Sequence, residues 1–247
     1  MIGIIGGSGL DNPDILSDPR DEVIGTKWGE PHSPIRIGRI SGVETALMAR
    51  HGRSHTVPPT FVNNRAHIQA LRELGCTAIL ATTAVGSLRE DIGRGDLVVL
   101  DQFIDFTRLR PVTFFEEFAP GEVKHTPMAE PFDPSLRSIL IQGCREAGFR
   151  HHSKGTVVTI EGPRFSTRAE SMMFRSWGAD VINMSVAPEC ALANEAGIPY
   201  AAVAMSTDYD CWKTDEEPVS WEAVLEVFGS NVGKVTELLT AVIPRIG

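Results

Sequence analysis

The chain has 247 residues, 42% of them apolar, and its 32 acidic and 23 basic side chains leave a formal net charge of −9. A chain of this length can bury enough surface to fold without disulfide bonds, which excludes disorder and small stapled scaffolds. The acidic balance argues against nucleic acid and against an anionic membrane as partners, and no apolar run is long enough to span a bilayer.

Short β-branched runs alternate with segments of helical periodicity, which predicts an α/β fold in one domain over residues 1–247. The runs that predict buried strands are 2–5, 45–49, 78–83, 97–100, 156–160, 181–184 and 200–205. The segments that predict helices are 62–74, 134–147, 167–177, 188–196 and 221–242, most of the first four ending near a glycine cap and the last preceded by Ser220 as its N-cap. Residues 106–131 lack periodicity and predict a long functional loop.

Four widely spaced cysteines indicate a reducing compartment. Cys76, Cys144, Cys190 and Cys211 include no C-x-x-C pair of the kind that binds zinc or forms a redox centre. We therefore expect free thiols, no metal site and a cytoplasmic protein.

The first candidate site directly follows the opening strand. In residues 6–9, Gly-Gly-Ser-Gly, small side chains let backbone N–H groups approach an anion, and the Ser8 hydroxyl adds a donor. A tight turn without a ligand is one alternative. A dinucleotide-binding loop is another, although the third glycine of that fingerprint is missing.

Three further strand ends carry donors for an anion. The Arg50 guanidinium can fork onto a phosphate and the His51 imidazole can donate to it. Thr83 offers a hydroxyl, Ala84 a backbone amide and Ser185 another hydroxyl. Each segment alone also fits a plain turn or core packing. Because ligands of open α/β sheets bind beyond the carboxyl ends of strands, these ends together predict a phosphate site.

The segment at residues 206–213, Ser-Thr-Asp-Tyr-Asp-Cys-Trp-Lys, is the most informative one. Asp208 and Asp210 can face the same way if the backbone stays extended. The Tyr, Cys and Trp around them imply partial burial, which raises carboxyl pKa values and favours a shared proton over a solvated acidic turn. The pair is a candidate proton donor.

With these segments the chain resembles the 5′-methylthioadenosine phosphorylases within the purine nucleoside phosphorylase family. The most specific stretches are residues 158–171, VTIEGPRFSTRAES, and residues 207–213, TDYDCWK, and the likeness covers nearly the whole chain. The resemblance implies a twisted mixed sheet flanked by helices, a homotrimer, and phosphate attack on C1′ of a nucleoside in purine and methionine salvage. Inorganic phosphate would be a co-substrate, and no metal or organic cofactor is implied.

The resemblance also implies roles for individual residues. Met184 would lie against the ribose, Phe165 would stack on the purine, and His125 in the long loop would reach the sugar of a neighbouring subunit. The phosphate ligands would be Ser8, Arg50, His51, Thr83, the Ala84 backbone and Ser185, with His51 also catalytic. The remaining substrate and specificity positions would be Tyr209, Ser166 and Trp221.

The chemistry of phosphorolysis agrees with an aspartate pair. The sugar becomes oxocarbenium-like while the leaving purine gathers negative charge, so the enzyme must protonate N7. A protonated Asp208 can donate to N7 while Asp210 accepts from the 6-amino group. A 6-oxopurine enzyme would more naturally use an amide here, so the pair favours 6-aminopurines. Trp221 at the 5′ pocket leaves the choice between methylthio and hydroxyl substituents open.

Three alternatives stay open from the sequence. A broader purine nucleoside phosphorylase would act on adenosine, inosine or guanosine. A hydrolytic nucleosidase would turn over without phosphate, and a nucleotide-cofactor protein would bind a dinucleotide. Neither of the last two uses all five segments.

Overall fold

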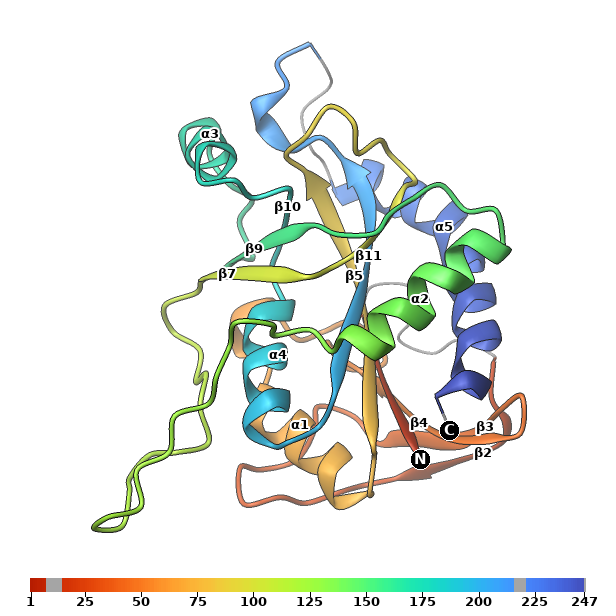
Figure 1. The fold of residues 1–247 in the computed structure, drawn as a ribbon, viewed down its shortest axis with the longest axis vertical. Coiled ribbons are helices and arrows are strands. Elements are labelled where there is room, and N and C mark those ends of the chain that lie inside the picture. The colour runs from red at the N-terminus through yellow and green to blue at the C-terminus, as the bar shows by residue number, and fades with distance from the viewer. Residues whose placement is uncertain (8–14, 216–220, 247) are drawn as a thin grey trace.

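A computed structural model describes residues 1–7, 15–215 and 221–246, without the side chains of residues 221–226, 228 and 230. Within this part of the chain, eleven strands form one twisted mixed sheet with helices on both faces (Figure 1). The strands are β1 (Ile2–Gly6), β2 (Ser17–Glu22), β3 (Ile35–Ile40), β4 (Val43–Ala49), β5 (Ala78–Ser87), β6 (Leu97–Val99), β7 (Gln102–Phe106), β8 (His151–His152), β9 (Thr156–Ile160), β10 (Val181–Asn183) and β11 (Tyr200–Asp208). The helices are α1 (Asn64–Glu73), α2 (Pro134–Glu146), α3 (Arg168–Ser176), α4 (Val186–Glu195) and α5 (Trp221–Val242).

The sheet forks at β5. One edge of β5 pairs in parallel with β1 as far as Ala81, and it pairs with the antiparallel β10 only from Gly86 onward. The other edge pairs in parallel with β11. The main branch has the order β2-β3-β4-β1-β5-β10-β9-β7, while β11 leads to β6 and β8. Among the described strands, none pairs with residues 82–85 on the β1 side, and residues 83–85 of this stretch line a cavity.

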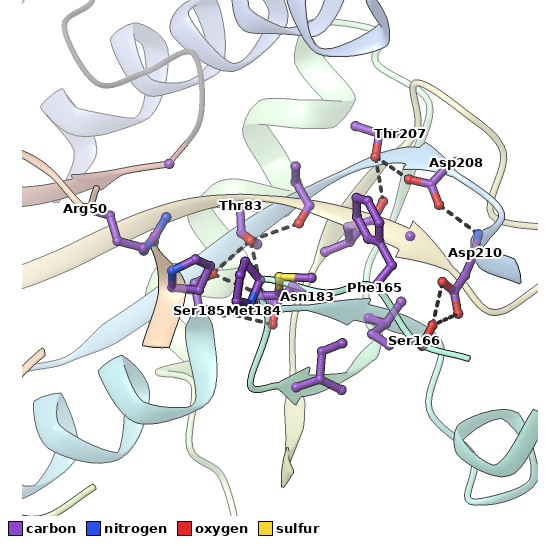
Figure 2. A pocket seen from close by; sticks show the side chains of 18 of the residues that line it. Arg50, Thr83, Phe165, Ser166, Asn183, Met184, Ser185, Thr207, Asp208 and Asp210 are labelled. Atoms are coloured by element: carbon purple, nitrogen blue, oxygen red, sulfur yellow. Dashed lines mark hydrogen bonds between the residues drawn. The ribbon is translucent and has the colours of Figure 1, made fainter. Parts of the chain in front are cut away.

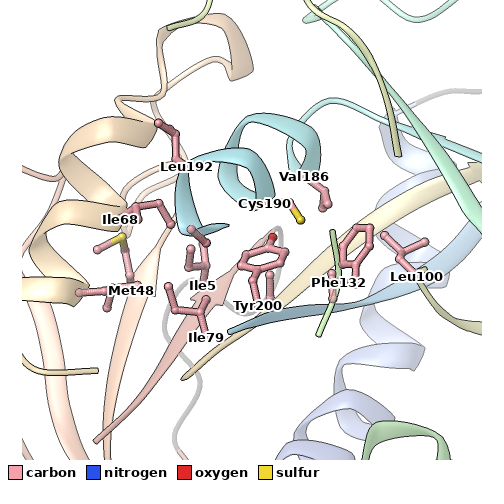
Figure 3. Close-up of a cluster of buried hydrophobic side chains, with 14 of the residues drawn as sticks. Ile5, Met48, Ile68, Ile79, Leu100, Phe132, Val186, Cys190, Leu192 and Tyr200 are labelled. Atoms are coloured by element: carbon pink, nitrogen blue, oxygen red, sulfur yellow. The ribbon is translucent and has the colours of Figure 1, made fainter. Parts of the chain in front are cut away.

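Alternation along the central strands fills a core on each face of the sheet. Ile79 of β5 and Tyr200 of β11 pack with α1 and α4 on one face (Figure 3). Their neighbours Leu80 and Ala201 pack with α2 and α5 on the other. Successive side chains of a strand point to opposite faces, so strands covered on both sides read as continuous apolar runs. This explains why the central strands are visible in the sequence.

The predicted α/β class is confirmed, and each strand and helix expected from the sequence lies within a few residues of its observed position. The Ser220 cap lies outside the described residues. The sequence does not predict β2, β3, β7 or β8. β2 is exposed along most of its length and β8 has two residues, and such strands depend on pairing with a neighbour more than on their own pattern.

The predicted glycine caps and the predicted long loop are also present. Gly75, Gly148, Gly178 and Gly197 follow the first four helices with φ between 68° and 88°, the left-handed conformation that glycine adopts at little cost. Residues 107–133 between β7 and α2 form the expected long loop, part of which projects from the body (Figure 1).

All four cysteines are free. No helix in the described part of the chain is long and apolar enough to cross a membrane.

Candidate active site

A cavity of about 440 Å³ opens beside the fork of the sheet. It is lined by residues at or beyond the carboxyl ends of β4, β5, β9, β10 and β11, as well as by the segment before α3. Figure 2 shows Arg50, Thr83 and Ser185 toward one end and Asp208 and Asp210 at the other. The segments predicted from the sequence therefore meet in one place.

A network of hydroxyl and amide groups forms the first end. Because β10 runs antiparallel to β5, the residues after β10 return alongside it, and the hydroxyls of Ser185 and Thr83 lie 3.1 Å apart. Asn183 sits between them, since Thr159 donates to its Oδ1 at 2.7 Å and its Nδ2 donates to Thr83 at 3.1 Å. The Ser185 backbone N–H, which can only donate, lies 3.4 Å from Oδ1, so the amide oxygen is on that side and Nδ2 faces the hydroxyls. Ala84 also lines the cavity.

Arg50, directly after β4, reaches the same end and is only 1% exposed. Its Nε and Nη2 donate to the two carboxylate oxygens of Glu189, Nη2 at 3.0 Å, and Nη1 donates to the Thr82 carbonyl at 2.9 Å. The Tyr200 hydroxyl donates to the same carboxylate at 2.8 Å. The guanidinium is thus charge-compensated and fixed in orientation. A Cβ on Gly7 would lie 2.7 Å from Nη1, so glycine leaves room for it.

His51 differs from the sequence-based expectation. Its Nδ1 lies 2.9 Å from the Val57 carbonyl and therefore carries the ring proton. Burial, and then the neighbouring Arg50 charge, lower the pKa of His51 to about 3. In the neutral ring Nε2 is an acceptor. His51 lines the cavity as predicted, but it offers an acceptor where the sequence predicted a donor.

The two aspartates form the second end. A register shift between Ser206 and Asp208 brings Asp208 beside Gly86 of β5. Asp208 accepts from the Thr207 hydroxyl and from the Asp210 amide, both at 2.8 Å. Its pKa is raised, chiefly because burial disfavours the charged carboxylate. A Cβ on Gly86 would lie 2.9 Å from Asp208 Oδ1, so this close approach requires glycine.

Asp210 is held by Ser166, in the segment before α3. Its φ of 45° lies in the left-handed region, and the Ser166 hydroxyl lies 2.8 Å from each of its carboxylate oxygens. Ser166 belongs to the segment that also carries Phe165, which is 43% exposed and faces the cavity. Phe165 and Met184 lie between the two ends in Figure 2. The cavity thus has an apolar middle and two polar ends.

Two predicted residues lie away from the cavity, and two others cannot be placed. Tyr209 does not line it, because its ring packs against Trp212 at 6.2 Å and under the Lys213 ammonium. His125 is an exposed residue of the long loop, outside the cavity of its own chain. Ser8 and the side chain of Trp221 lie outside the described residues.

Sequence reasoning assigned no role to several residues that build the site. Asn183 stands next to Met184 in the predicted strand end, so its position was available as a signal. The Pro-Glu pair at 188–189 looks like an ordinary helix start, and nothing local marks Glu189 as a buried partner of Arg50. Within residues 1–7, 15–215 and 221–246, no group of three or more His, Cys, Asp or Glu side chains is arranged to hold a metal ion.

Comparisons with known proteins agree with this arrangement. A family model described as the Phosphorylase superfamily matches residues 1–244. The chain is 54% identical over 249 residues to S-methyl-5′-thioadenosine phosphorylase of Xenopus tropicalis, covering 99% of this chain and 88% of that one. Methylthioadenosine phosphorylase from Schistosoma mansoni in complex with adenine superposes with a TM-score of 0.94 at 43% identity, over 100% of this chain and 91% of that one. A mutant of the Schistosoma mansoni adenosine/methylthioadenosine phosphorylase in complex with methylthioadenosine gives 0.93 at 42% identity, with the same coverage.

Proposed function

Because the chain belongs to the phosphorylase superfamily, we propose that it cleaves 5′-methylthioadenosine with inorganic phosphate to give adenine and 5-methylthioribose 1-phosphate. Its relatives named S-methyl-5′-thioadenosine phosphorylase share about half of its residues over 99% of its length. The reaction is a pentosyl transfer in which phosphate is a co-substrate and no metal or organic cofactor takes part.

The observation that carries the proposal is the pairing of two chemically different ends in one cavity. Phosphate lies at the end formed by Thr83, Ser185 and Arg50, with the Ala84 amide and Ser8 completing its ligands. The neutral His51 accepts from a protonated phosphate oxygen through Nε2. Hydroxyl donors and a compensated guanidinium hold the nucleophile in place without a large excess of positive charge.

At the other end, Asp208 acts on the leaving purine. Its raised pKa favours the protonated form that donates to N7 while negative charge develops on the base. Asp210, oriented by Ser166, accepts from the 6-amino group. Phe165 stacks on the purine and Met184 lies against the ribose. Tyr209 supports this turn from outside the cavity, and Trp221 shapes the 5′ pocket.

We further propose that the enzyme works as a cytoplasmic homotrimer in purine and methionine salvage, with no nucleic acid or membrane partner. Phe61 and Leu109 are more than 70% exposed, and Phe165 at the mouth of the cavity is 43% exposed. An interface between copies would remove such side chains from water, which supports an assembly of several subunits. In such an assembly, His125 of the long loop contacts the sugar bound by the neighbouring subunit.

Product analysis tests the proposal directly. The enzyme is incubated with 5′-methylthioadenosine, adenosine or inosine, each with and without phosphate, and the bases are separated by chromatography. We expect adenine from the methylthio substrate only when phosphate is present. Release without phosphate would indicate a hydrolase, and faster cleavage of inosine would indicate a 6-oxopurine enzyme. Either result would overturn the assignment.

A further inference from the structure

Arg110 is a buried side chain contributed by the long loop, and the site described above does not use it. The residue is 7% exposed, and its side chain is only 1% exposed. Nη1 donates to the Met184 carbonyl at 2.6 Å, and Nη2 donates to the carbonyls of Ile160, at 3.3 Å, and Glu161. One guanidinium therefore bonds to the backbone of two separate strand ends.

Glu161 ties the same arginine to its own loop. One carboxylate oxygen accepts from Arg110 Nε at 2.9 Å. The other accepts from the backbone amides of Arg108 and Leu109, at 2.7 and 3.0 Å. The Arg110 side chain, the Glu161 side chain and the backbone amides of Arg108 and Leu109 thus form one hydrogen-bonded unit, which we call the Arg110 clamp.

The strand ends that the clamp holds no longer pair with each other, although Ile160 still pairs with Phe106 of β7 on its other edge. The pairing between β10 and β9 ends at Asn183 and Thr159. Beyond this point Met184 and Ile160 line the cavity, and the chain after Glu161 leads to Pro163 and Phe165, which line it too. Because a backbone carbonyl buried without a partner is costly, the Arg110 donors favour one position of these ends.

We propose that Arg110 is a positioning residue for the sugar and base wall of the cavity. It acts through the carbonyls of Met184, Ile160 and Glu161 and touches no reacting atom. The Met184 carbonyl belongs to the peptide bond before Ser185, and the Arg110 charge acts on His51, so the clamp also borders the phosphate end. That end has further supports of its own in Asn183, Glu189 and Thr159, and we therefore expect the clamp to govern nucleoside binding more than phosphate binding. This inference rests on the proposed function, because it assigns the nucleoside to this wall.

The test compares two arginines of the same loop. Arg110→Met removes the clamp, while Arg108→Met changes an exposed side chain two residues away and leaves its backbone amide on Glu161 intact. For Arg110→Met we expect kcat/KM for 5′-methylthioadenosine to fall about 100-fold, mostly through a higher nucleoside KM, because small displacements at a site cost rates of this order. The KM for phosphate should stay within about twofold of wild type, and Arg108→Met should match wild type in both.

A purely structural role would give a different result. Loss of folded enzyme lowers the apparent kcat and leaves both KM values unchanged, and general loosening raises both KM values together; either pattern in Arg110→Met overturns the proposal. If Arg110→Met does not fold, Arg110→Lys and Glu161→Gln are measured instead. If neither variant raises the nucleoside KM while leaving the phosphate KM unchanged, the proposal is overturned in the same way.

A wild-type enzyme that releases no adenine from 5′-methylthioadenosine with phosphate would refute the proposed function. The clamp is then tested by calorimetry: loss of adenine binding in Arg110→Met, with phosphate binding kept, supports it, and unchanged adenine binding overturns it.

Discussion

The buried pair of Arg50 and Glu189 gives a prediction whose size follows from the structure. The substitution Glu189→Gln keeps the shape of the side chain but removes its charge. It also replaces one carboxylate oxygen with an N–H group that faces the donors of Arg50 or Tyr200. The two charged side chains are 2% and 0% exposed, so water cannot replace the lost partner.

The expected cost is large compared with the stability of a typical domain. Breaking a buried ion pair by removing one partner costs about 3–5 kcal/mol, because the other charge stays buried and uncompensated. Native proteins are stable by only about 5–15 kcal/mol. Tyr200→Phe removes one hydrogen bond to the same carboxylate and should cost less, about 1.5–3 kcal/mol. The double variant Arg50→Met with Glu189→Leu should be more stable than Glu189→Gln, because it leaves no unpaired charge.

Urea unfolding near neutral pH, at one protein concentration for all variants, measures these differences. Phosphate kinetics supply a second readout. With its orientation lost, Arg50 should bind phosphate less well, and we expect the phosphate KM of Glu189→Gln to rise about tenfold, equivalent to ~1.4 kcal/mol. A free energy of unfolding within about 1 kcal/mol of wild type would refute the reasoning, since a buried unpaired charge costs more than that. So would a double variant whose loss equals the sum of the Arg50→Met and Glu189→Leu losses.

Three further predictions concern the purine end of the cavity and one buried histidine. Asp208→Asn should shift preference from adenosine toward inosine, because an amide can donate to O6; an unchanged rate ratio would remove Asp208 from base recognition. Gly86→Ala would place a Cβ 2.9 Å from Asp208 Oδ1, so nucleoside kcat/KM should fall about 100-fold while phosphate KM changes little; wild-type kinetics would contradict this. Burial lowers the pKa of His67 from 6.5 to about 3. Between these two pH values the unfolded chain binds one more proton there, so stability falls by about 1.4 kcal/mol for each unit by which the pH is lowered. Urea titrations of His67→Asn should show a slope shallower by that amount, and curves parallel to wild type would exclude His67 as the source.

His67, in α1, is a fully buried polar side chain that the proposed reaction does not use. Neither ring nitrogen has a hydrogen-bond partner in the part of the chain that the structure describes, and the ring meets that of His32 edge-on at 5.5 Å. A buried N–H without a partner lowers stability. We therefore expect the free energy of unfolding at acid pH to depend on His67 in α1 as well as on the residues of the cavity.

The sequence by itself determined the class of fold and the position of the site along the chain. Strands buried on both faces appear in the sequence as continuous apolar runs. The central strands and their carboxyl ends could therefore be located from short stretches of sequence alone. Thr83, Ser185 and Asp208 each follow or end such a run, and the cavity brings all three together. The polar edge strand β2 could not be found in this way, because its conformation comes from pairing with β3.

Only the tertiary structure decided how the site residues are held and what each can do. Arg50 forms an ion pair with Glu189, 139 residues later in the chain, and Arg110 donates to the Met184 carbonyl, 74 residues later. His51 becomes an acceptor because a folded turn places the Val57 carbonyl on its other nitrogen. No local pattern encodes such partners. They depend on which strands and helices come together, and a hydrogen bond or an ion pair acts only over the last few ångströms between them.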